Sequence, residues 1–315
     1  MRVLVTGATG FLGHAVVAAL AARGHEVVAL SRTGSRVPEA SAACVRGDIR
    51  QADTLASAVA GVEAVCHLAA LARVRESLTD PLAYWQTNTV GTINLLQALA
   101  ATSTTTAPKC LVLASTCLVY ETAGAHPIDE SAPTAPSNPY GASKLAADQA
   151  AAHLAATGVL GAVSLRAFNI AGASGSAVDR DETRLIPKIL AVQAGRAAEL
   201  VVNGDGSAVR DFVHVADMAD AVVRALDACT PGTWRAYNVG SGHRTAVRDV
   251  IAAAQEVTGR PVPVRHRPAA PEPPVLLADS TRIRTELGWQ PRRSQIRQIL
   301  TDAWSALASA YAGRE

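Results

Sequence analysis

Tyr140 and Lys144 stand four positions apart in the segment NPYGASKLAAD. A helix would therefore place the phenol and the ammonium on one face, a single turn apart. A free tyrosine has a pKa near ~10, so a phenolate at neutral pH needs a decrease of about 3 units, or roughly 4 kcal/mol of favourable field. A neighbouring ammonium acts in that direction, which makes the pair a candidate general base. Because the same spacing occurs on many helices without function, the prediction needs support from other residues.

A glycine turn near the N-terminus gives the first support. The apolar run RVLVT at residues 2–6 leads into GATGFLG and then into an alanine-rich stretch at 15–23, in the order strand, turn, helix. Gly7 would allow the tight turn, Gly10 the approach of backbone N–H groups to a pyrophosphate, and Gly13 close packing of helix and sheet. The spacing is G-x-x-G-x-x-G rather than G-x-G-x-x-G. The turn alone is weak evidence, but its strand-to-helix context favours a dinucleotide.

Two hydroxyl residues give the second support. Ser115 and Thr116 end the apolar run at 109–114. Ligands lie at the carboxyl ends of strands in a doubly wound sheet, so Thr116 can hydrogen-bond the oxygen that Tyr140 deprotonates. The alternative is a Ser/Thr pair that only caps a strand.

The order of elements gives the third. HLAA at 67–70 closes another apolar run, and NTVGT at 88–92 opens a helix. Strands and helices thus alternate, which predicts an α/β fold with a doubly wound parallel sheet.

Composition narrows the class of protein. The 315 residues carry 29 basic and 27 acidic side chains, with no basic run that would indicate nucleic acid. No apolar run approaches the roughly 18–20 residues of a membrane span, so we expect a cytoplasmic protein. The five cysteines are scattered without metal or disulfide spacing, and no metal site is predicted. The length favours two lobes that share a cleft.

We expect the larger lobe, which would bind the dinucleotide, to comprise residues 1–170 and a returning segment at about 212–240. Residues 171–211 and 241–315 would form a smaller C-terminal α/β lobe for the substrate.

Several segments together resemble the nucleotide-sugar epimerase and dehydratase family of extended short-chain dehydrogenases/reductases. The resemblance covers nearly the whole chain and rests on TGATGFLG, GDIR (47–50), HLAA (67–70), NTVGTINLL (88–96), STCLVY (115–120), YGASK (140–144), LRAFNIAGA (165–173), VRDFVHVADMADA (209–221), YNVGSG (237–242) and ELGWQP (286–291).

The resemblance implies roles for individual residues. Tyr140 matches the catalytic base, Lys144 its partner on the nicotinamide ribose, and Thr116 the hydroxyl residue beside them. Asp48 and Ile49 match adenine contacts, and Asn88 matches a residue that lines the cofactor. The full set of expected cofactor-binding residues is Gly7, Gly10, Phe11, Leu12, Gly13, Ser31, Arg32, Asp48, Ile49, Leu68, Ala69, Ala70, Asn88, Ser115, Tyr140 and Lys144.

The choice between NAD and NADP depends on the end of the second expected strand. The acidic residue that usually binds the ribose hydroxyls is replaced by Ser31, followed by Arg32 and later Arg36. An arginine attracts a 2′-phosphate, so the sequence slightly favours NADP. The alternative is a solvated Arg32, with NAD held through Ser31 and Asp48.

On the substrate side, Asn169, Leu185 and Arg210 match positions that contact a nucleotide diphosphate in the family. A forked guanidinium suits a pyrophosphate, although Arg210 could instead pair with Asp211. Glu272 takes the position of an aspartate that relatives use. Ala269 takes that of a second arginine, and Arg267 is displaced from it by two residues.

The residues after Thr116 narrow the reaction. Sugar 4,6-dehydratases of the family resemble one another in having Asp-Glu there, whereas this chain has Cys117 and Leu118. Dehydration is therefore not expected, although Cys117 can still touch the substrate. FNIAGA and VRDVIAAAQEVTGRPVPV resemble the UDP-glucose 4-epimerase branch most closely.

We therefore predict 4-epimerisation of a nucleotide-diphosphate sugar through a transient 4-keto sugar. An NADPH-dependent reductase of a 4-keto nucleotide sugar is the alternative, and a cofactor-binding regulatory protein without turnover a distant one. The resemblance also implies a homodimer, in which the alanine-rich stretches at 145–156 and 94–101 could pair across a two-fold axis; the alternative is that these alanine faces pack internally.

Overall fold

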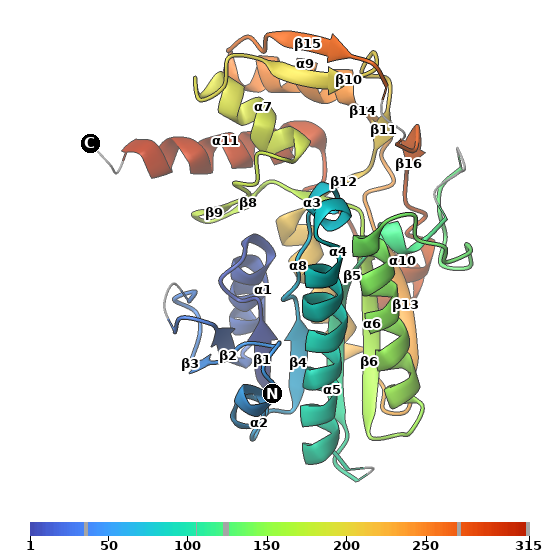
Figure 1. Cartoon of the computed structure of the whole chain (residues 1–315). Coiled ribbons are helices and arrows are strands. Elements are labelled where there is room, and N and C mark those ends of the chain that lie inside the picture. Colours follow the sequence, from blue (N-terminus) through green and yellow to red (C-terminus); the bar gives the residue numbers. More distant parts are fainter. Residues whose placement is uncertain (35–36, 105, 122–125, 270–271, 313–315) are drawn as a thin grey trace.

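The computed structural model describes residues 1–34, 37–104, 106–121, 126–269 and 272–312. Its largest sheet has seven parallel strands in the spatial order β13-β6-β5-β4-β1-β2-β3, which confirms the predicted fold class (Figure 1). The strands are β1 (Arg2–Thr6), β2 (Glu26–Ser31), β3 (Ala43–Arg46), β4 (Ala64–His67), β5 (Lys109–Thr116), β6 (Leu160–Ala167) and β13 (Trp234–Val239).

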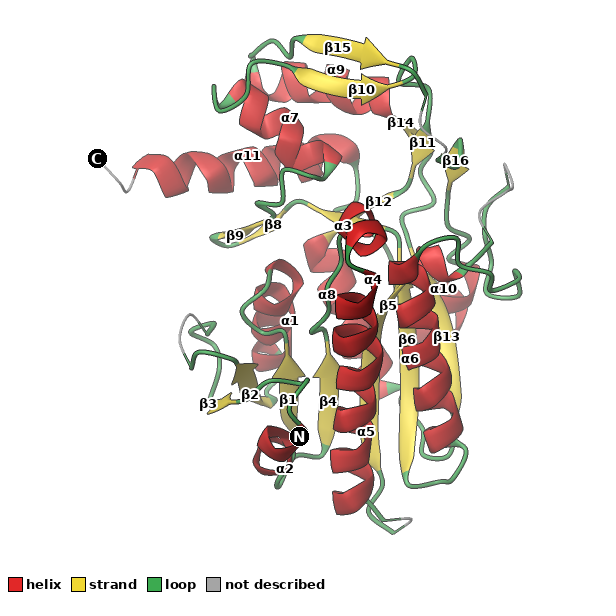
Figure 2. Ribbon diagram, in the orientation of Figure 1, coloured by secondary structure: helices red, strands yellow, loops and turns green. Residues whose placement is uncertain are grey.

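The central strands are apolar because helices cover both faces of the sheet. Successive side chains of a strand point to opposite faces, so Val3 and Val5 pack in one core and Leu4 in the other. One face carries α1 (Phe11–Ala22) and α8 (Val215–Asp227). The other carries α2 (Leu55–Ala58), α5 (Gly91–Thr102) and α6 (Pro139–Ala155), and Figure 2 shows α5 and α6 in front of the sheet.

The strand order reverses beside β1, since β2 and β3 lie on one side of it and β4 on the other. In doubly wound sheets ligands bind at the carboxyl ends of the strands next to this point. Short helical segments surround it here: η1 (Ala52–Thr54), α3 (Val74–Thr79), α4 (Pro81–Tyr84), the π-helical η2 (Trp85–Val90) and η3 (Cys117–Val119).

A smaller layer of structure lies beyond the carboxyl ends of the sheet (Figure 1). Ile189, Leu200, Val250 and Ile299 belong to a separate apolar core there. Its helices are α7 (Leu185–Gln193), α9 (Val247–Thr258) and α11 (Ile296–Ala312). The strand pairings are β10 (Leu200–Asn203) with β15 (Val264–Arg267), β11 (Val209–Arg210) with β14 (Thr245–Ala246) and β16 (Val275–Leu276), β12 (Phe212–His214) with β7 (Asn169–Ala171), and β8 (Ala173–Ser174) with β9 (Ala177–Val178).

One segment lies elsewhere than the sequence suggested. Ile283 in α10 (Thr281–Leu287) and the fully buried Trp289 pack in the core that α1 and α8 share. The Trp289 indole also donates a hydrogen bond to the Asp217 carbonyl oxygen in α8, with an N–O distance of 2.8 Å. Residues 281–289 therefore belong with the larger lobe, although we had assigned them to the smaller one.

The described part of the chain holds no helix that is long and apolar enough to cross a bilayer.

Candidate active site

Helix α6 places Tyr140 and Lys144 at the carboxyl ends of β5 and β6. Its start is well defined, because Pro139 occupies the first turn and the Asn138 side chain accepts a hydrogen bond from the Gly141 N–H at 2.9 Å. Tyr140, Thr116 and Cys117 all line one cavity of about 780 Å³ between the two lobes. The phenol and the hydroxyl thus lie together as predicted, although their catalytic roles stay predictions.

Burial dominates the charge states of the pair in the ligand-free protein. Burial raises the pKa of Tyr140 to about 12, while its interaction with the Thr116 hydroxyl and the charge of Arg184 oppose that increase. Burial lowers the pKa of Lys144 to about 8, although Asp148 acts to raise it. In the protein alone Tyr140 is therefore a phenol. The predicted phenolate needs a further positive charge beside it.

A buried polar cluster supports this end of α6. Both oxygens of the Asp148 carboxylate are engaged: they accept hydrogen bonds from Ser115 at 3.1 Å and from Ser164 at 2.8 Å, and Arg166 Nε lies 3.4 Å away. Arg166 also donates to the Tyr120 hydroxyl at 2.8 Å. No sequence pattern predicted Asp148 as a neighbour of Ser115, because the two are far apart along the chain.

The glycine turn fits a dinucleotide. Gly7 has a φ of +70°, and a Cβ there would lie 2.8 Å from the Ala69 backbone nitrogen. A Cβ at Gly13 would lie 2.1 Å from the Gly7 carbonyl oxygen. No side chain caps the first turn of α1, whose N-cap is Gly10, so its N–H groups are available to a phosphate. Phe11 and Leu12 lie in that first turn.

Asn88 holds the loop after β4, which is the next segment of the expected cofactor site. Its side chain accepts from the Leu71 N–H at 2.8 Å and donates to the Leu71 carbonyl at 3.0 Å and to Ser143 at 3.0 Å. These bonds fix the loop that contains Leu68, Ala69 and Ala70 against α6. The Asn88 amide is therefore occupied by the protein, and its expected place along the cofactor stays a prediction.

The sequence did not predict a chain of hydrogen-bonded hydroxyl and imidazole groups that lies beneath this loop. His67 contacts Thr6 at 2.7 Å through Nδ1 and Thr92 at 3.0 Å through Nε2. Burial lowers the pKa of His67 to about 3, so the ring is neutral. The Thr6 hydroxyl also accepts from the N–H groups of Leu68 and Ala69, both at 3.2 Å, which makes this chain structural.

The residues expected to bind the adenosine part of the dinucleotide lie at the carboxyl ends of β2 and β3. Ser31 is buried, whereas Arg32 is exposed. Arg50 holds Asp48 with an N–O distance of 2.6 Å, and this hydrogen bond lowers the pKa of the carboxyl. Ile49 is buried, and Arg36 lies outside the described residues.

The expected substrate residues share the cavity that Tyr140 lines: Cys117, Asn169, Leu185, Arg210 and Glu272. Arg210 pairs with Glu272 at 3.2 Å, rather than with Asp211 as the alternative suggested. Arg267 lines the same cavity, but its guanidinium donates to Asn203. A diphosphate approaching Arg210 thus competes with a resident carboxylate.

Asp211 has a different role. Its carboxylate accepts from the Ser241 N–H and hydroxyl, both at 2.7 Å, from the Gly242 N–H at 2.9 Å and from the Ala278 N–H at 3.1 Å. It therefore joins chain segments that lie at the junction of the two lobes.

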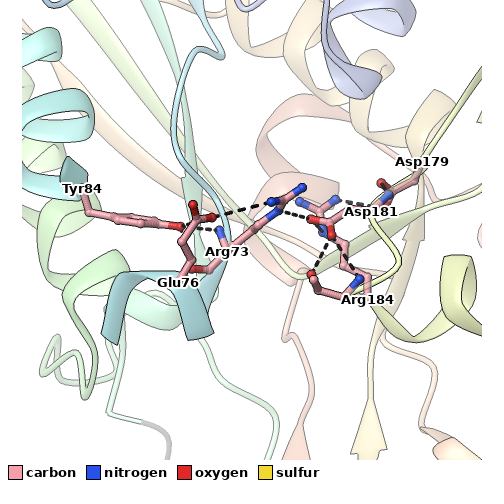
Figure 3. Close-up of polar contacts among 7 residues, drawn as sticks. Arg73, Glu76, Tyr84, Asp179, Asp181 and Arg184 are labelled. Carbon is pink, nitrogen blue, oxygen red and sulfur yellow. Dashed lines mark hydrogen bonds and ion pairs between the residues drawn. The ribbon is translucent and has the colours of Figure 1, made fainter. Parts of the chain in front are cut away.

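A group of charged residues beside the cavity was also missed. Figure 3 shows Arg73 facing Asp181, with Arg184 bound to Asp179 on the far side. The sequence could not pair Arg73 with Asp181, because no local pattern relates residues so distant.

Comparison with known proteins agrees with this geometry. The profile of the NAD dependent epimerase/dehydratase family matches residues 3–240. A protein named UDP-glucose 4-epimerase from Corynebacterium glutamicum is 39% identical over 327 residues, which cover 100% of this chain and 98% of that protein.

Two crystal structures are similar over nearly their full length. UDP-glucose 4-epimerase from Brucella ovis, in complex with NAD, is 33% identical with a TM-score of 0.88 and covers 96% of this chain and 97% of its own. The enzyme of that name from Stenotrophomonas maltophila, with bound NAD and formylated UDP-arabinopyranose, is 34% identical with a TM-score of 0.88 and covers 99% of each chain. Similarity of this extent, together with the profile match, shows that this chain belongs to the NAD dependent epimerase/dehydratase family.

Proposed function

We propose that this protein is a nucleotide-sugar 4-epimerase that acts on a UDP-sugar with NAD or NADP as its bound cofactor. The observation that carries the proposal is one cavity that Tyr140 and Thr116 line together with Arg210. The glycine turn supplies a pyrophosphate site for the dinucleotide. The names and ligands of the similar proteins support both the reaction and the UDP-sugar.

Tyr140 performs the proton transfers in this reaction. It accepts the proton of the sugar 4-hydroxyl, while Thr116 hydrogen-bonds the same oxygen and orients it. A bound nicotinamide would accept hydride from C4 of the sugar and later return it, and its positive charge would also favour the Tyr140 phenolate. The 4-keto sugar turns within the cavity about its diphosphate, which Arg210 holds. Tyr140 then returns its proton to the oxygen at C4.

The residues after Thr116 do not suit dehydration. Burial raises the pKa of Cys117 to about 12, so its side chain is a neutral thiol at physiological pH. Leu118 has no titratable group. Positions 117 and 118 therefore do not supply the acid–base pair that removal of water from the sugar requires.

The preference for NADP stays a prediction, since the NAD-bound relatives show only that the family holds NAD. Arg32 is exposed at the end of β2 and its charge acts on Asp48, so it can reach a 2′-phosphate. Because Arg32 favours NADP, an NADPH-dependent keto-sugar reductase is the second candidate function.

A homodimer is our proposal for the assembly. Several large apolar side chains are exposed between α3 and α5, and a second copy would cover them. They are Leu78, Leu82, Trp85, Val90 and Ile93. A cytoplasmic location stays a prediction from the sequence.

The fate of the hydride tests the proposed reaction. The enzyme is incubated with UDP-glucose deuterated at C4 and excess unlabelled NAD(P)H. We expect the C4 epimer to keep its deuterium, because the sugar receives back the hydride it gave, with no net change in reduced-cofactor absorbance. Loss of the label to the cofactor pool, or stoichiometric NADPH consumption with a 4-keto sugar, would favour the reductase.

Replacing Tyr140 with Phe tests the proton acceptor. The ring still packs, but the hydroxyl is lost, so we expect kcat to fall by on the order of 10²–10⁴-fold with the fold intact. Circular dichroism and steady-state kinetics measure the two effects. Retention of more than a tenth of wild-type turnover would exclude Tyr140 as the base.

Lys144→Met tests the energetic effect of the buried ammonium. The pKa of about 8 in the folded state lies below the ordinary 10.5, so the folded protein binds this proton less readily than the unfolded chain. The folded state is therefore penalised at pH 7, by about 3 kcal/mol, and the penalty disappears as the pH rises from about 8 towards 10.5.

We expect the ligand-free Lys144→Met variant to be more stable than the wild type in urea unfolding at pH 7, with a gap that narrows above pH 8, and to have lost most of its activity. A variant that is less stable at pH 7 would contradict the assignment of an unfavourable buried charge.

Replacing Arg32 with Ala tests the cofactor preference. If the guanidinium binds a 2′-phosphate, the variant should bind NADP roughly 10–150-fold more weakly, since a charged hydrogen bond contributes about 1.5–3 kcal/mol, and should bind NAD almost unchanged. Calorimetric titration with both cofactors measures the difference. Equal changes would show that Arg32 does not select NADP.

A further inference from the structure

The start of α3 connects the two lobes across the edge of the cavity. Arg73, the residue before this helix, donates from Nε to Asp181 Oδ2 at 3.0 Å. Arg75, within the helix, lies 3.6 Å from Glu272. Both arginines belong to the larger lobe and both carboxylates to the smaller one. Figure 3 shows the first of these pairs between Tyr84 and Arg184.

Tyr84 connects the same backbone to the candidate base. Its hydroxyl donates to the Arg73 carbonyl oxygen at 2.7 Å and accepts from the Arg73 N–H at 3.1 Å. Its ring is fully buried and meets the Tyr140 ring edge-on, with centroids 6.2 Å apart and an interplanar angle of 78°. Such edge-to-face pairs are favourable and restrict the orientation of both rings.

We propose that Tyr84 is a positioning residue for Tyr140, and that the Arg73–Asp181 ion pair makes this positioning depend on contact between the lobes. The contacts form one continuous chain from Asp181 through the Arg73 guanidinium and peptide to the Tyr84 hydroxyl and ring, and then to Tyr140. This inference rests on the proposed epimerase reaction for its kinetic test.

The ion pair suits a contact that opens and closes. The side chain of Arg73 is 51% exposed and that of Asp181 13% exposed, so water screens the pair and its strength is modest. A UDP-sugar must enter and leave a cavity that Arg73, Arg75 and Glu272 line. Contact between the lobes then brings Tyr140 into its working orientation once the substrate is inside.

Two variants interrupt the chain at different points. Tyr84→Phe keeps the ring beside Tyr140 but frees the Arg73 peptide. Asp181→Asn removes the charge opposite Arg73 and keeps an oxygen for the hydrogen bonds from Thr183. Glu182→Gln is the matched control, because Glu182 is the exposed neighbour of Asp181 and pairs with Arg196 of the same lobe at 3.0 Å.

The kinetic test is a double-mutant cycle on kcat and KM with UDP-glucose. We expect each single variant to lower kcat about fivefold and to change KM less than about twofold, since neither residue lines the cavity. The double variant should lose no more than about tenfold, because both changes break one chain. Independent effects would multiply to about 25-fold and would overturn the proposal, as would a control that behaves like Asp181→Asn.

Hydrogen exchange gives a test without turnover. Asp181→Asn should increase amide exchange in residues 72–84 relative to the wild type, and Glu182→Gln should not. If the wild type fails to epimerise UDP-sugars, the proposed function is wrong, and this measurement still decides whether the lobes are linked to Tyr84. Unchanged exchange in Asp181→Asn would overturn the link, even if Tyr84→Phe folds poorly.

Discussion

The ammonium of Lys144 is buried at the end of the sheet, and much of the surrounding structure compensates for that charge. Burial alone would favour the neutral amine, as the lowered pKa shows. Asp148 lies one turn further along α6 and provides the opposing charge, while Ser115, Ser164 and Arg166 satisfy its oxygens. The strands, the helix and their polar contacts are thus arranged around one buried group that is unfavourable for folding and that we propose for the chemistry.

The protonation state of Tyr140 depends on its surroundings in the protein and also on any charged group that binds beside it. The protein alone keeps the phenol protonated, since burial outweighs the favourable influence of Thr116 and Arg184. In the mechanism that we propose, a cationic ring bound at the glycine turn would supply the missing field. The strength of Tyr140 as a general base would then be a property of the complex and not of the ligand-free protein.

The sequence predicted those features that short segments determine. Alternating apolar runs predicted the doubly wound sheet, the glycine spacing predicted the turn before α1, and the four-residue spacing of Tyr140 and Lys144 predicted that one face of a helix carries both. Pairings between distant segments could not be predicted: Arg73 with Asp181, Arg210 with Glu272, and Trp289 in the core beside α8. No local pattern specifies them, because they depend on how the lobes meet. The phenol state of Tyr140 was also out of reach, since the competition between burial and charge requires coordinates.

The hydrogen bonds to Asp211 have a consequence for how such proteins diversify. One carboxylate accepts hydrogen bonds from Ser241, Gly242 and Ala278, so it ties together chain segments that pass between the lobes. Neither lobe is one contiguous stretch of the chain. Ile283 and Trp289 pack in the core of the larger lobe, although they follow residues of the smaller lobe in the sequence. The smaller lobe therefore cannot be replaced as one unit without cutting the chain where it crosses between the lobes. Single substitutions along the wall of the cavity, in contrast, can change the side chains that face a ligand and leave these contacts intact.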